Sequence, residues 1–260
     1  TLLQGALPNV APSARPDLLL NLGETRRRQG RTADAERIFR ELVGARPGEA
    51  PGHAGLARVA EDRGDLAGAL AAWDLYLKAR PEDEAASLRR EELRELKASI
   101  AVLRAAASAA PGAGIFAELG RLLAVAGDAA GSAEACRRAL AIDGTHLDAR
   151  RGLAMALRDL GEARGAAAQF RSLLASAPAD AVALYALVDL ARKRGDGRAE
   201  EAAWRALIAA RPNELPAARA FIAFLERNGD GALAKEIDSL EETAPDGAGG
   251  GSAAGAPGLR

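Results

Sequence analysis

Apolar residues recur along this chain at intervals of three and four, in paired stretches separated by a glycine. The first pair is LLLNLGETRRRQG (18–30), followed by GRTADAERIFRELVGARP (30–47). That spacing is typical of the buried face of an amphipathic helix. Glycine suits a tight turn because it adopts positive φ without steric cost, and proline ends a helix because it has no N–H to donate. The pattern predicts two helices that are joined at Gly30 and end before Pro47.

This pair of helices repeats with a fixed period. Turn glycines stand at positions 30, 64, 127, 161, 195 and 229, so successive spacings are 34, 63, 34, 34 and 34 residues. A leucine precedes each of the first five glycines by eight residues. A period in this range indicates a repeat architecture, in which each unit packs only on its neighbours. The sequence therefore predicts an all-α array of helix pairs.

The residues at fixed positions of this period resemble the tetratricopeptide repeat, in a bacterial-type protein. Position 4 is small or apolar, 7 is Leu, 8 is Gly or Ala, 15 is Gly, 20 is Ala, 24 is aromatic, 27 is Leu or Ala and 32 is Pro. In the first unit these residues are Leu19, Leu22, Gly23, Gly30, Ala35, Phe39, Leu42 and Pro47. The resemblance implies a right-handed superhelical solenoid of antiparallel helix pairs over about residues 16–242.

The resemblance divides the chain into an irregular start at 1–15, the array at 16–242 and a tail at 243–260 that is rich in Gly and Ala. We expect the tail to be flexible because its composition buries too little apolar surface to order it. Its GAGGGSAAG stretch lacks the GK[ST] ending of a phosphate-binding loop. The expected units are 16–49, 50–83, an irregular segment at 84–112, 113–146, 147–180, 181–214 and a capping unit at 215–242.

Three departures from the pattern affect the predicted packing. Position 24 is Cys136 in one unit, which we expect to be a small core residue rather than a nucleophile. Position 20 is Glu200 where a small residue is expected, so the packing of unit 181–214 follows least directly from the pattern. Position 24 of the last unit is Asp238, and a polar outer face is what a capping repeat needs.

The 63-residue spacing is five residues short of two periods. The segment between the two glycines concerned, EDEAASLRREELRELKASIAVLRAAASAAP (82–111), has no turn glycine and is rich in helix formers. Either a repeat has lost its turn or one long helix interrupts the array. We favour a trimmed helical pair, with Leu88, Leu93 and Leu96 on one apolar face and Ile100 and Leu103 on the other.

Composition narrows the possible functions. The net charge is -1 and the pI is about 6.2, so no overall field favours nucleic acid or an anionic membrane. Of the 35 basic residues, 31 are arginine. One cysteine and two distant histidines argue against a structural zinc site, and no apolar run is long enough to span a membrane. Because the first residue is Thr1 rather than Met, we expect a fragment or a processed product. We favour a cytoplasmic location slightly over a periplasmic one.

No catalytic motif such as HExxH or GxSxG appears, so we expect no enzyme activity, no cofactor and no metal. His53 is expected to pack within its helix pair and His146 to lie in a loop between units. Two Arg-Gly-Asp tripeptides, at 63–65 and 194–196, fall on the inter-helix turn. There we expect the aspartate to cap the following helix.

The resemblance implies a concave face formed by positions 2, 5, 9, 12 and 13 of each unit. Arginine holds carboxylates bidentately, so an acidic or C-terminal peptide is a reasonable ligand, although charged residues are also the ordinary surface of exposed helices. The clamp for chaperone tails and the asparagine ladder of sugar transferases, both known in this family, are absent from the corresponding positions. The candidate partner-binding residues are Arg27, Arg28, Arg58, Arg121, Arg151, Met155, Arg158, Tyr185, Asp189, Arg192, Lys193 and Arg219.

We interpret the chain as a non-catalytic interaction scaffold or adaptor that binds a peptide or protein partner, in the assembly of a larger complex. Its rigid helices would present a preformed groove, which lowers the cost of ordering a bound peptide. The alternative is an accessory or regulatory region of a larger enzyme, such as a glycosyltransferase. Binding of single-stranded RNA is a weaker interpretation, because no base-selecting pair recurs in every unit.

Overall fold

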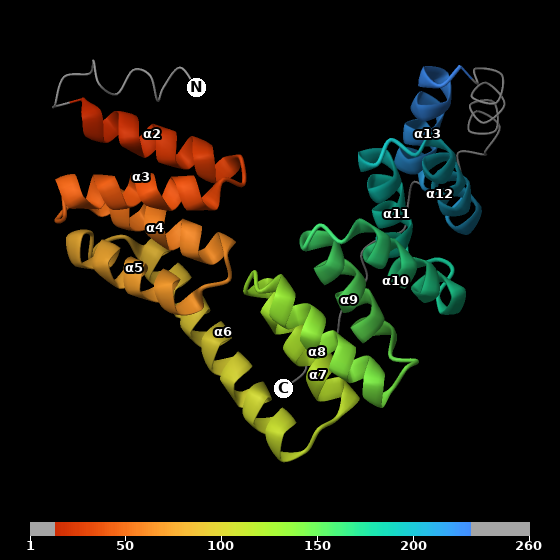
Figure 1. The fold of residues 1–260 in the computed structure, drawn as a ribbon, viewed down its shortest axis with the longest axis horizontal. Helices are drawn as coiled ribbons and strands as arrows, with labels where there is room; N and C mark the ends of the chain where they lie inside the picture. Colours follow the sequence, from red (N-terminus) through yellow and green to blue (C-terminus); the bar gives the residue numbers. More distant parts are fainter. Residues whose placement is uncertain (1–13, 230–260) are drawn as a thin grey trace, which may run out of the picture. The chain divides into compact units, whose positions relative to one another are not determined.

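The computed structural model describes residues 14–229, and within them the chain forms an all-α array of antiparallel helix pairs (Figure 1). Three predicted segments lie wholly or in part outside the described residues: the start of the chain up to residue 13, the second part of the capping unit with Asp238, and the tail. The helices are α2 (Arg15–Arg28), α3 (Thr32–Ala45), α4 (Ala50–Asp62), α5 (Leu66–Ala79), α6 (Glu84–Ala109), α7 (Ala113–Val125), α8 (Ala129–Ile142), α9 (Leu147–Asp159), α10 (Ala163–Ser176), α11 (Ala181–Lys193), α12 (Gly197–Ala210) and α13 (Leu215–Arg227).

The predicted turns are confirmed at every glycine of the period. All six turn glycines have φ between 66° and 83°, which is the left-handed region that favours glycine. The predicted aspartate caps are also present. The side chain of Asp65 accepts a hydrogen bond from Gly68 N at the start of α5, and that of Asp196 accepts one from Ala199 N at the start of α12.

In each repeat unit, we call the helix before the turn glycine the first helix and the helix after it the second helix. The first helices of neighbouring units approach each other around one side chain of the second helix between them. Phe39 of α3 lies against Gly23 of α2 and Gly55 of α4, and a Cβ on Gly23 would lie 2.6 Å from its ring. Cys136 of α8 has the same place between α7 and α9, where a Cβ on Gly120 would lie 2.6 Å from its Sγ. Cys136 is buried, which confirms its predicted role as a small core residue.

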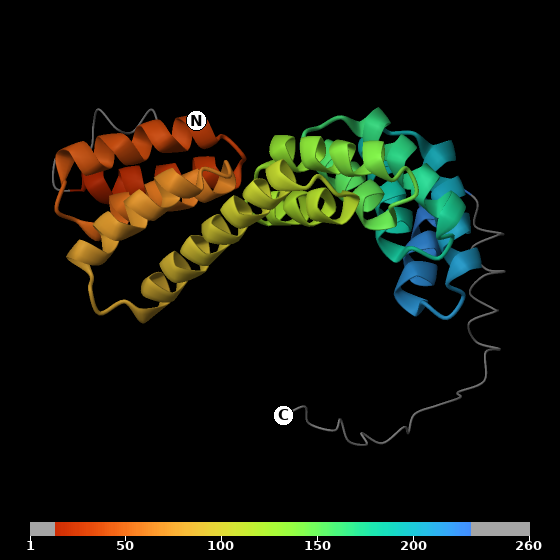
Figure 2. The ribbon, with the colours of Figure 1, turned by 90° about the horizontal axis from the view of Figure 1, so that it is seen from below.

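The chain divides into two compact units, and the boundary falls within α10, between Gln169 and Phe170. In the first unit, α2 to α5 lie side by side in chain order (Figures 1 and 2). Its apolar core comprises clusters centred on α2–α4, on α4–α6 and on α6–α9. In the second unit, Trp204 of α12 packs with Phe221 and Phe224 of α13 and with Leu184 of α11.

The helical pair favoured for 82–111 is wrong, and the alternative of one long helix is correct: residues Glu84–Ala109 form one continuous helix of 26 residues, α6. Asp83 caps its start, and no glycine or proline interrupts it before Ala109. Leu93 packs with the α4–α5 side and Ile100 with α7, so one helix contacts both neighbouring pairs. Leu88, expected on a buried face, is 64% exposed.

Two turns meet beside α6. A Cβ on Gly64, in the turn between α4 and α5, would lie 2.7 Å from the backbone nitrogen of Asp128, in the turn between α7 and α8. A Cβ on Gly127 would lie 2.9 Å from the backbone oxygen of Glu61. Because backbone atoms cannot move aside as a flexible side chain can, only glycine fits at this contact.

We expect Gly64→Ala to destabilise the protein more than Gly30→Ala. Both substitutions place a Cβ at positive φ, which costs about 1–2 kcal/mol. Gly30 has open space around its Cβ position, whereas Gly64→Ala adds a backbone collision that costs about 1–3 kcal/mol more. Urea unfolding of both variants measures the difference, and equal losses would show that the two turns do not touch in solution.

Candidate functional site

Cys136 and both histidines of the described residues lie within the packing of the helices. The described residues contain no group of three or more His, Cys, Asp and Glu able to hold a metal ion. Burial raises the pKa of the Cys136 thiol, which keeps it protonated. His53 is buried, with Nε2 2.9 Å from the backbone oxygen of Pro47, and His146 Nδ1 accepts a hydrogen bond from Ala149 N at the start of α9. Both histidines therefore have places in the helix packing.

A groove of about 560 Å³ lies between α7 and α9, both of which are first helices of their pairs. We call it the α7–α9 groove. Three of the predicted binding residues, Arg121, Arg151 and Met155, line it. The other lining residues are mainly small, with charged residues among them: Gly114, Ala117, Glu118, Gly120, Ala124, Val125, His146, Asp148, Gly152 and Asp159.

Ion pairs within single helices hold the arginines of this groove. Arg121 Nη2 lies 2.5 Å from Glu118 Oε1, and Arg151 Nη1 lies 2.6 Å from Asp148 Oδ1. The hydrogen bond from Arg121 lowers the pKa of Glu118. At least one side chain of each pair is exposed to solvent, so each ion pair contributes little to stability. A ligand carboxylate could therefore replace Glu118 or Asp148 at small cost.

The predicted residues on α2 and α4 form a separate cluster in the same unit. Arg27 lies between two carboxylates, 2.8 Å from Glu24 Oε1 and 2.9 Å from Asp62 Oδ2. Arg28 Nε lies 3.2 Å from the same oxygen of Glu24, and the charge of Arg58 also acts on that carboxylate. These hydrogen bonds, chiefly the one from Arg27, lower the pKa of Glu24 to about 2.

The remaining predicted residues contact neighbours in or beside their own helices. Arg158, at the end of α9, pairs with Asp159 at 2.9 Å. In the second unit, Lys193 Nζ lies 2.8 Å from Asp189 Oδ2. The Tyr185 hydroxyl donates to Glu214 Oε1 over 2.5 Å, which links α11 to the start of α13 and raises the pKa of Tyr185.

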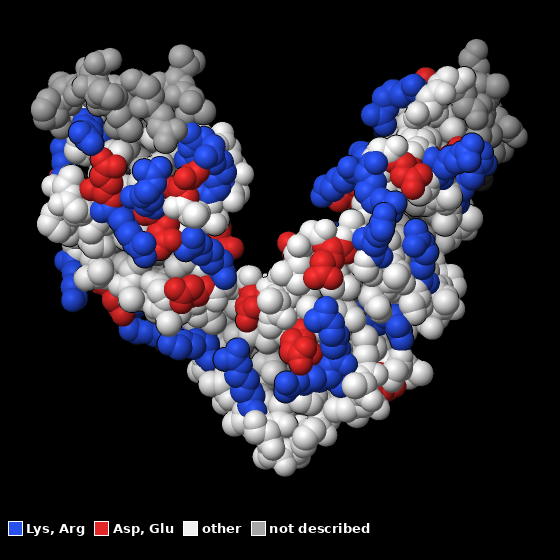
Figure 3. Space-filling view, in the orientation of Figure 1, with Lys and Arg blue, Asp and Glu red and all other residues white. Residues whose placement is uncertain are grey.

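Charges of both signs alternate on the face shown in Figure 3, as the near-zero net charge predicts. Arg219 is exposed and has no ion pair among residues 14–229. The predicted residues of the first unit, apart from Arg158, thus gather at two places, the α7–α9 groove and the α2–α4 cluster. Those of α11 and α13 lie in the second unit.

Arg192 has a structural role that the sequence did not indicate. Its Nε donates to Glu200 Oε1 over 2.9 Å, and its guanidinium lies 6.0 Å from the centre of the Trp204 ring. Glu200 is only 7% exposed, so Arg192 balances a buried charge. This pair explains how unit 181–214 accommodates a glutamate where a small residue is expected.

Position 12 is Glu61 in unit 50–83 but Arg192 in unit 181–214, and this difference changes the partner of the tryptophan at position 24. In unit 50–83, Trp73 Nε1 donates to Glu61 Oε1 over 2.6 Å. In unit 181–214, Trp204 Nε1 is buried with no hydrogen-bond partner among the described residues. A buried N–H without an acceptor costs about 1–3 kcal/mol, which the Arg192–Glu200 pair has to offset.

Sequence comparison identifies the repeat. Residues 19–84, which include most of α2 and all of α3 to α5, match the family model described as Tetratricopeptide repeat. These residues carry tetratricopeptide repeats. This confirms the resemblance seen in the spacing of leucine, glycine, aromatic and proline residues. A comparison with curated proteins found no match.

Solved structures with the tetratricopeptide repeat fold resemble this chain at low identity. One is MamA, with 17% identity and a TM-score of 0.45, covering 77% of this chain and 96% of MamA. Another is YrrB, whose structure is described as a TPR protein with an unusual peptide-binding site, with 14% identity, a TM-score of 0.39 and coverage of 85% and 97%. PilF of Pseudomonas aeruginosa has 14% identity, a TM-score of 0.41 and coverage of 89% and 92%. These likenesses say nothing about a partner of this chain.

We expect Arg192→Met to destabilise the repeat array. It leaves the buried Glu200 carboxylate without its cation, which should lower the free energy of unfolding by about 1–3 kcal/mol. The matched control is Arg205→Met, which removes an exposed partner of Glu201 and should change stability by less than about 0.5 kcal/mol. Urea unfolding measures both, and similar effects would mean that the buried pair contributes no more than an exposed one.

The Glu24 cluster predicts a dependence of stability on pH. Because the pKa of Glu24 is lowered from 4.5 to about 2 in the folded state, its ionised form stabilises the fold above pH 4.5 and this contribution is lost as the pH falls through 2. Glu24→Gln should lower the free energy of unfolding by about 1–2 kcal/mol at neutral pH and by much less near pH 2.

The control for this measurement is Glu95→Gln, on the exposed side of α6. Urea unfolding of both variants across the same pH range separates the ion pairing of Glu24 from the removal of any carboxylate. A difference between Glu24→Gln and the wild type that does not change with pH would contradict the ion pairing of Glu24 with Arg27.

Proposed function

We propose that this protein is a non-catalytic scaffold or adaptor that holds a peptide segment of a partner protein, in the assembly of a larger complex. The α7–α9 groove is the proposed binding site, and its size and small-residue lining carry the proposal. A volume of about 560 Å³ lies within the range of pockets that hold small ligands or short peptide segments.

The lining of the groove fits an extended chain. The Cβ positions of Gly120 and Gly152 face Cys136 in the core, and Ala117 and Ala124 add only methyl groups to the lining, so the backbone of a peptide can come close to α7 and α9. Val125, which is 65% exposed, and the half-buried Met155 offer apolar contacts to a side chain of the peptide. Covering these two side chains removes apolar surface from water, which stabilises a complex.

The arginines favour an acidic residue in the bound segment. The planar guanidinium binds a carboxylate with two parallel hydrogen bonds, and Arg121 and Arg151 lie on opposite helices of the groove. Their present partners, Glu118 and Asp148, are exposed and easily exchanged. The other predicted residues with exposed side chains, among them Arg28, Arg58 and Arg219, are proposed as secondary contacts for longer partners.

The test is a selection from a random peptide library displayed against the full chain. We expect enrichment of peptides with one apolar residue next to an acidic one. Binding of a selected peptide, measured by fluorescence anisotropy, should weaken at least about tenfold in the double variant Arg121→Glu/Arg151→Glu, because the two new carboxylates repel the acidic residue of the peptide. Ala124→Trp should also abolish binding, because the indole fills the groove without a change of charge.

The matched control is Arg137→Glu/Arg164→Glu, which changes two exposed arginines that do not line the groove. It should bind the peptide as the wild type does, and circular dichroism should show the same helicity for all variants. Peptides that bind the wild type and both groove variants equally would place the site elsewhere on the array.

A further inference from the structure

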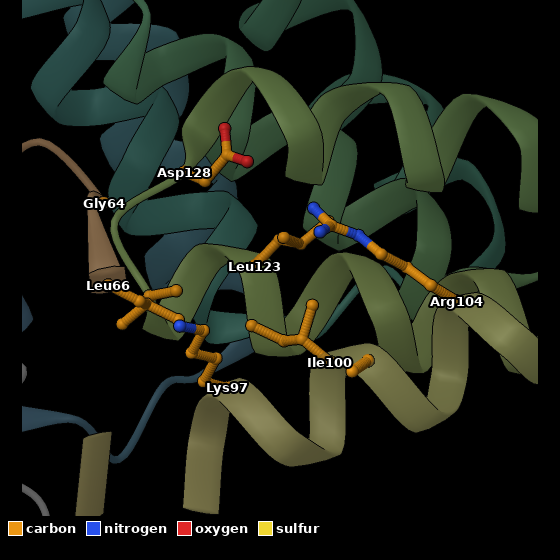
Figure 4. A pocket seen from close by; sticks show the side chains of 9 residues that line it. Gly64, Leu66, Lys97, Ile100, Arg104, Leu123 and Asp128 are labelled. Atoms are coloured by element: carbon orange, nitrogen blue, oxygen red, sulfur yellow. The ribbon is translucent and has the colours of Figure 1, made fainter. Parts of the chain in front are cut away.

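A second cavity, of about 230 Å³, lies between α6 and the two turns that meet beside it (Figure 4). Gly64 and Leu66 of one turn and Ala126 and Asp128 of the other form part of its wall. Ile100 of α6 and Leu123 of α7 contribute apolar surface. This cavity is distinct from the α7–α9 groove, since the two have no lining residue in common.

Two cations of α6 line this cavity without an acidic partner. Lys97 and Arg104 are seven residues apart, so they lie on one side of the helix, two turns from each other. Figure 4 shows both side chains extending from α6 toward the turns. Among the described residues, neither forms an ion pair.

The other arginines of α6 show that this lack of a partner is local. Arg89 pairs with Glu61 at 2.7 Å, Arg90 with Asp74 at 3.3 Å and Arg94 with Asp74 at 3.4 Å. The first half of the helix is thus neutralised by carboxylates on α4 and α5. Lys97 and Arg104 lie farther along α6 and have no such carboxylate beside them within residues 14–229. Their two positive charges therefore line the same cavity.

The acidic group in the wall is engaged elsewhere. Asp128 caps α8, where its Oδ1 accepts a hydrogen bond from Gly131 N over 2.8 Å. Its charge is offset in part by the positive end of the α8 dipole. The second helix that starts at the turn contact, α5, brings another positive end to the same place, which Asp65 caps in the same way.

We propose that this cavity binds a small oxyanion of the phosphate class, free or as a phosphate monoester. The ammonium of Lys97 supplies a point charge, and the guanidinium of Arg104 donates two parallel hydrogen bonds to phosphate oxygens. Both donors lie on α6, beside the contact between the two turns. The bound anion would therefore neutralise the two like charges that face this cavity.

Titration calorimetry of the full chain with inorganic phosphate, at constant ionic strength, tests the proposal. The wild type should bind phosphate in the millimolar range or tighter, and should unfold at a higher temperature with phosphate than with chloride. Lys97→Met/Arg104→Met should weaken phosphate binding at least about tenfold. Lys78→Met/Arg137→Met removes one exposed lysine and one exposed arginine that do not line the cavity, and should leave binding unchanged.

A parallel titration with glycerol 3-phosphate distinguishes the two sources of the anion. Tighter binding than that of inorganic phosphate identifies a monoester as the ligand, and weaker binding identifies the free ion. No heat with either compound on the wild type would overturn the proposal, as would equal binding by the Lys97→Met/Arg104→Met variant.

Discussion

The close approach of neighbouring first helices around one side chain is the constraint on which the repeat depends. Gly23 and Gly55 leave room for Phe39, and Gly120 and Gly152 leave room for Cys136. Any larger residue at these glycines would push the helices apart, so the spacing of the array is set at these points. Gly120 and Gly152 also line the α7–α9 groove. The packing of the core and the shape of the candidate site therefore depend on the same two residues.

Most of the fold follows from local sequence signals. One or two residues are enough to predict each glycine turn and each aspartate cap. The structure has a turn at each of the six glycines, and a cap at Asp65 and at Asp196. The length of the segment that forms α6 favoured a pair of helices. The segment has no glycine or proline at which a turn would form, and it is one helix. Its buried residues Ala86, Leu93, Ile100 and Ala107 recur every seven positions, which is the spacing of one helix that packs along its whole length.

The sequence predicted which side chains of the candidate site share a helix face, but not the interactions that they make. Placing Arg121, Arg151 and Met155 on the first helices brought them to one groove, because helical spacing determines which residues share a face. The ionic partner of Arg192 and the second partner of Arg27 were not predictable, because Glu200 lies on another helix and Asp62 lies 35 residues away. Such pairs depend on how whole helices pack, and they decide whether an arginine is available to a ligand or belongs to the fold.

The balance of charge shapes how such an array could recognise a partner. Most acidic groups on the first helices of the described residues pair with an arginine, and the net charge is -1, so the protein exerts little long-range attraction on a charged ligand. Recognition must then come from contact: a peptide has to fit the groove before its carboxylate can replace Glu118 or Asp148. Exchange of one exposed ion pair for another changes the free energy little, so the apolar contacts with Val125 and Met155 would supply most of the affinity and the arginines would decide which sequence binds.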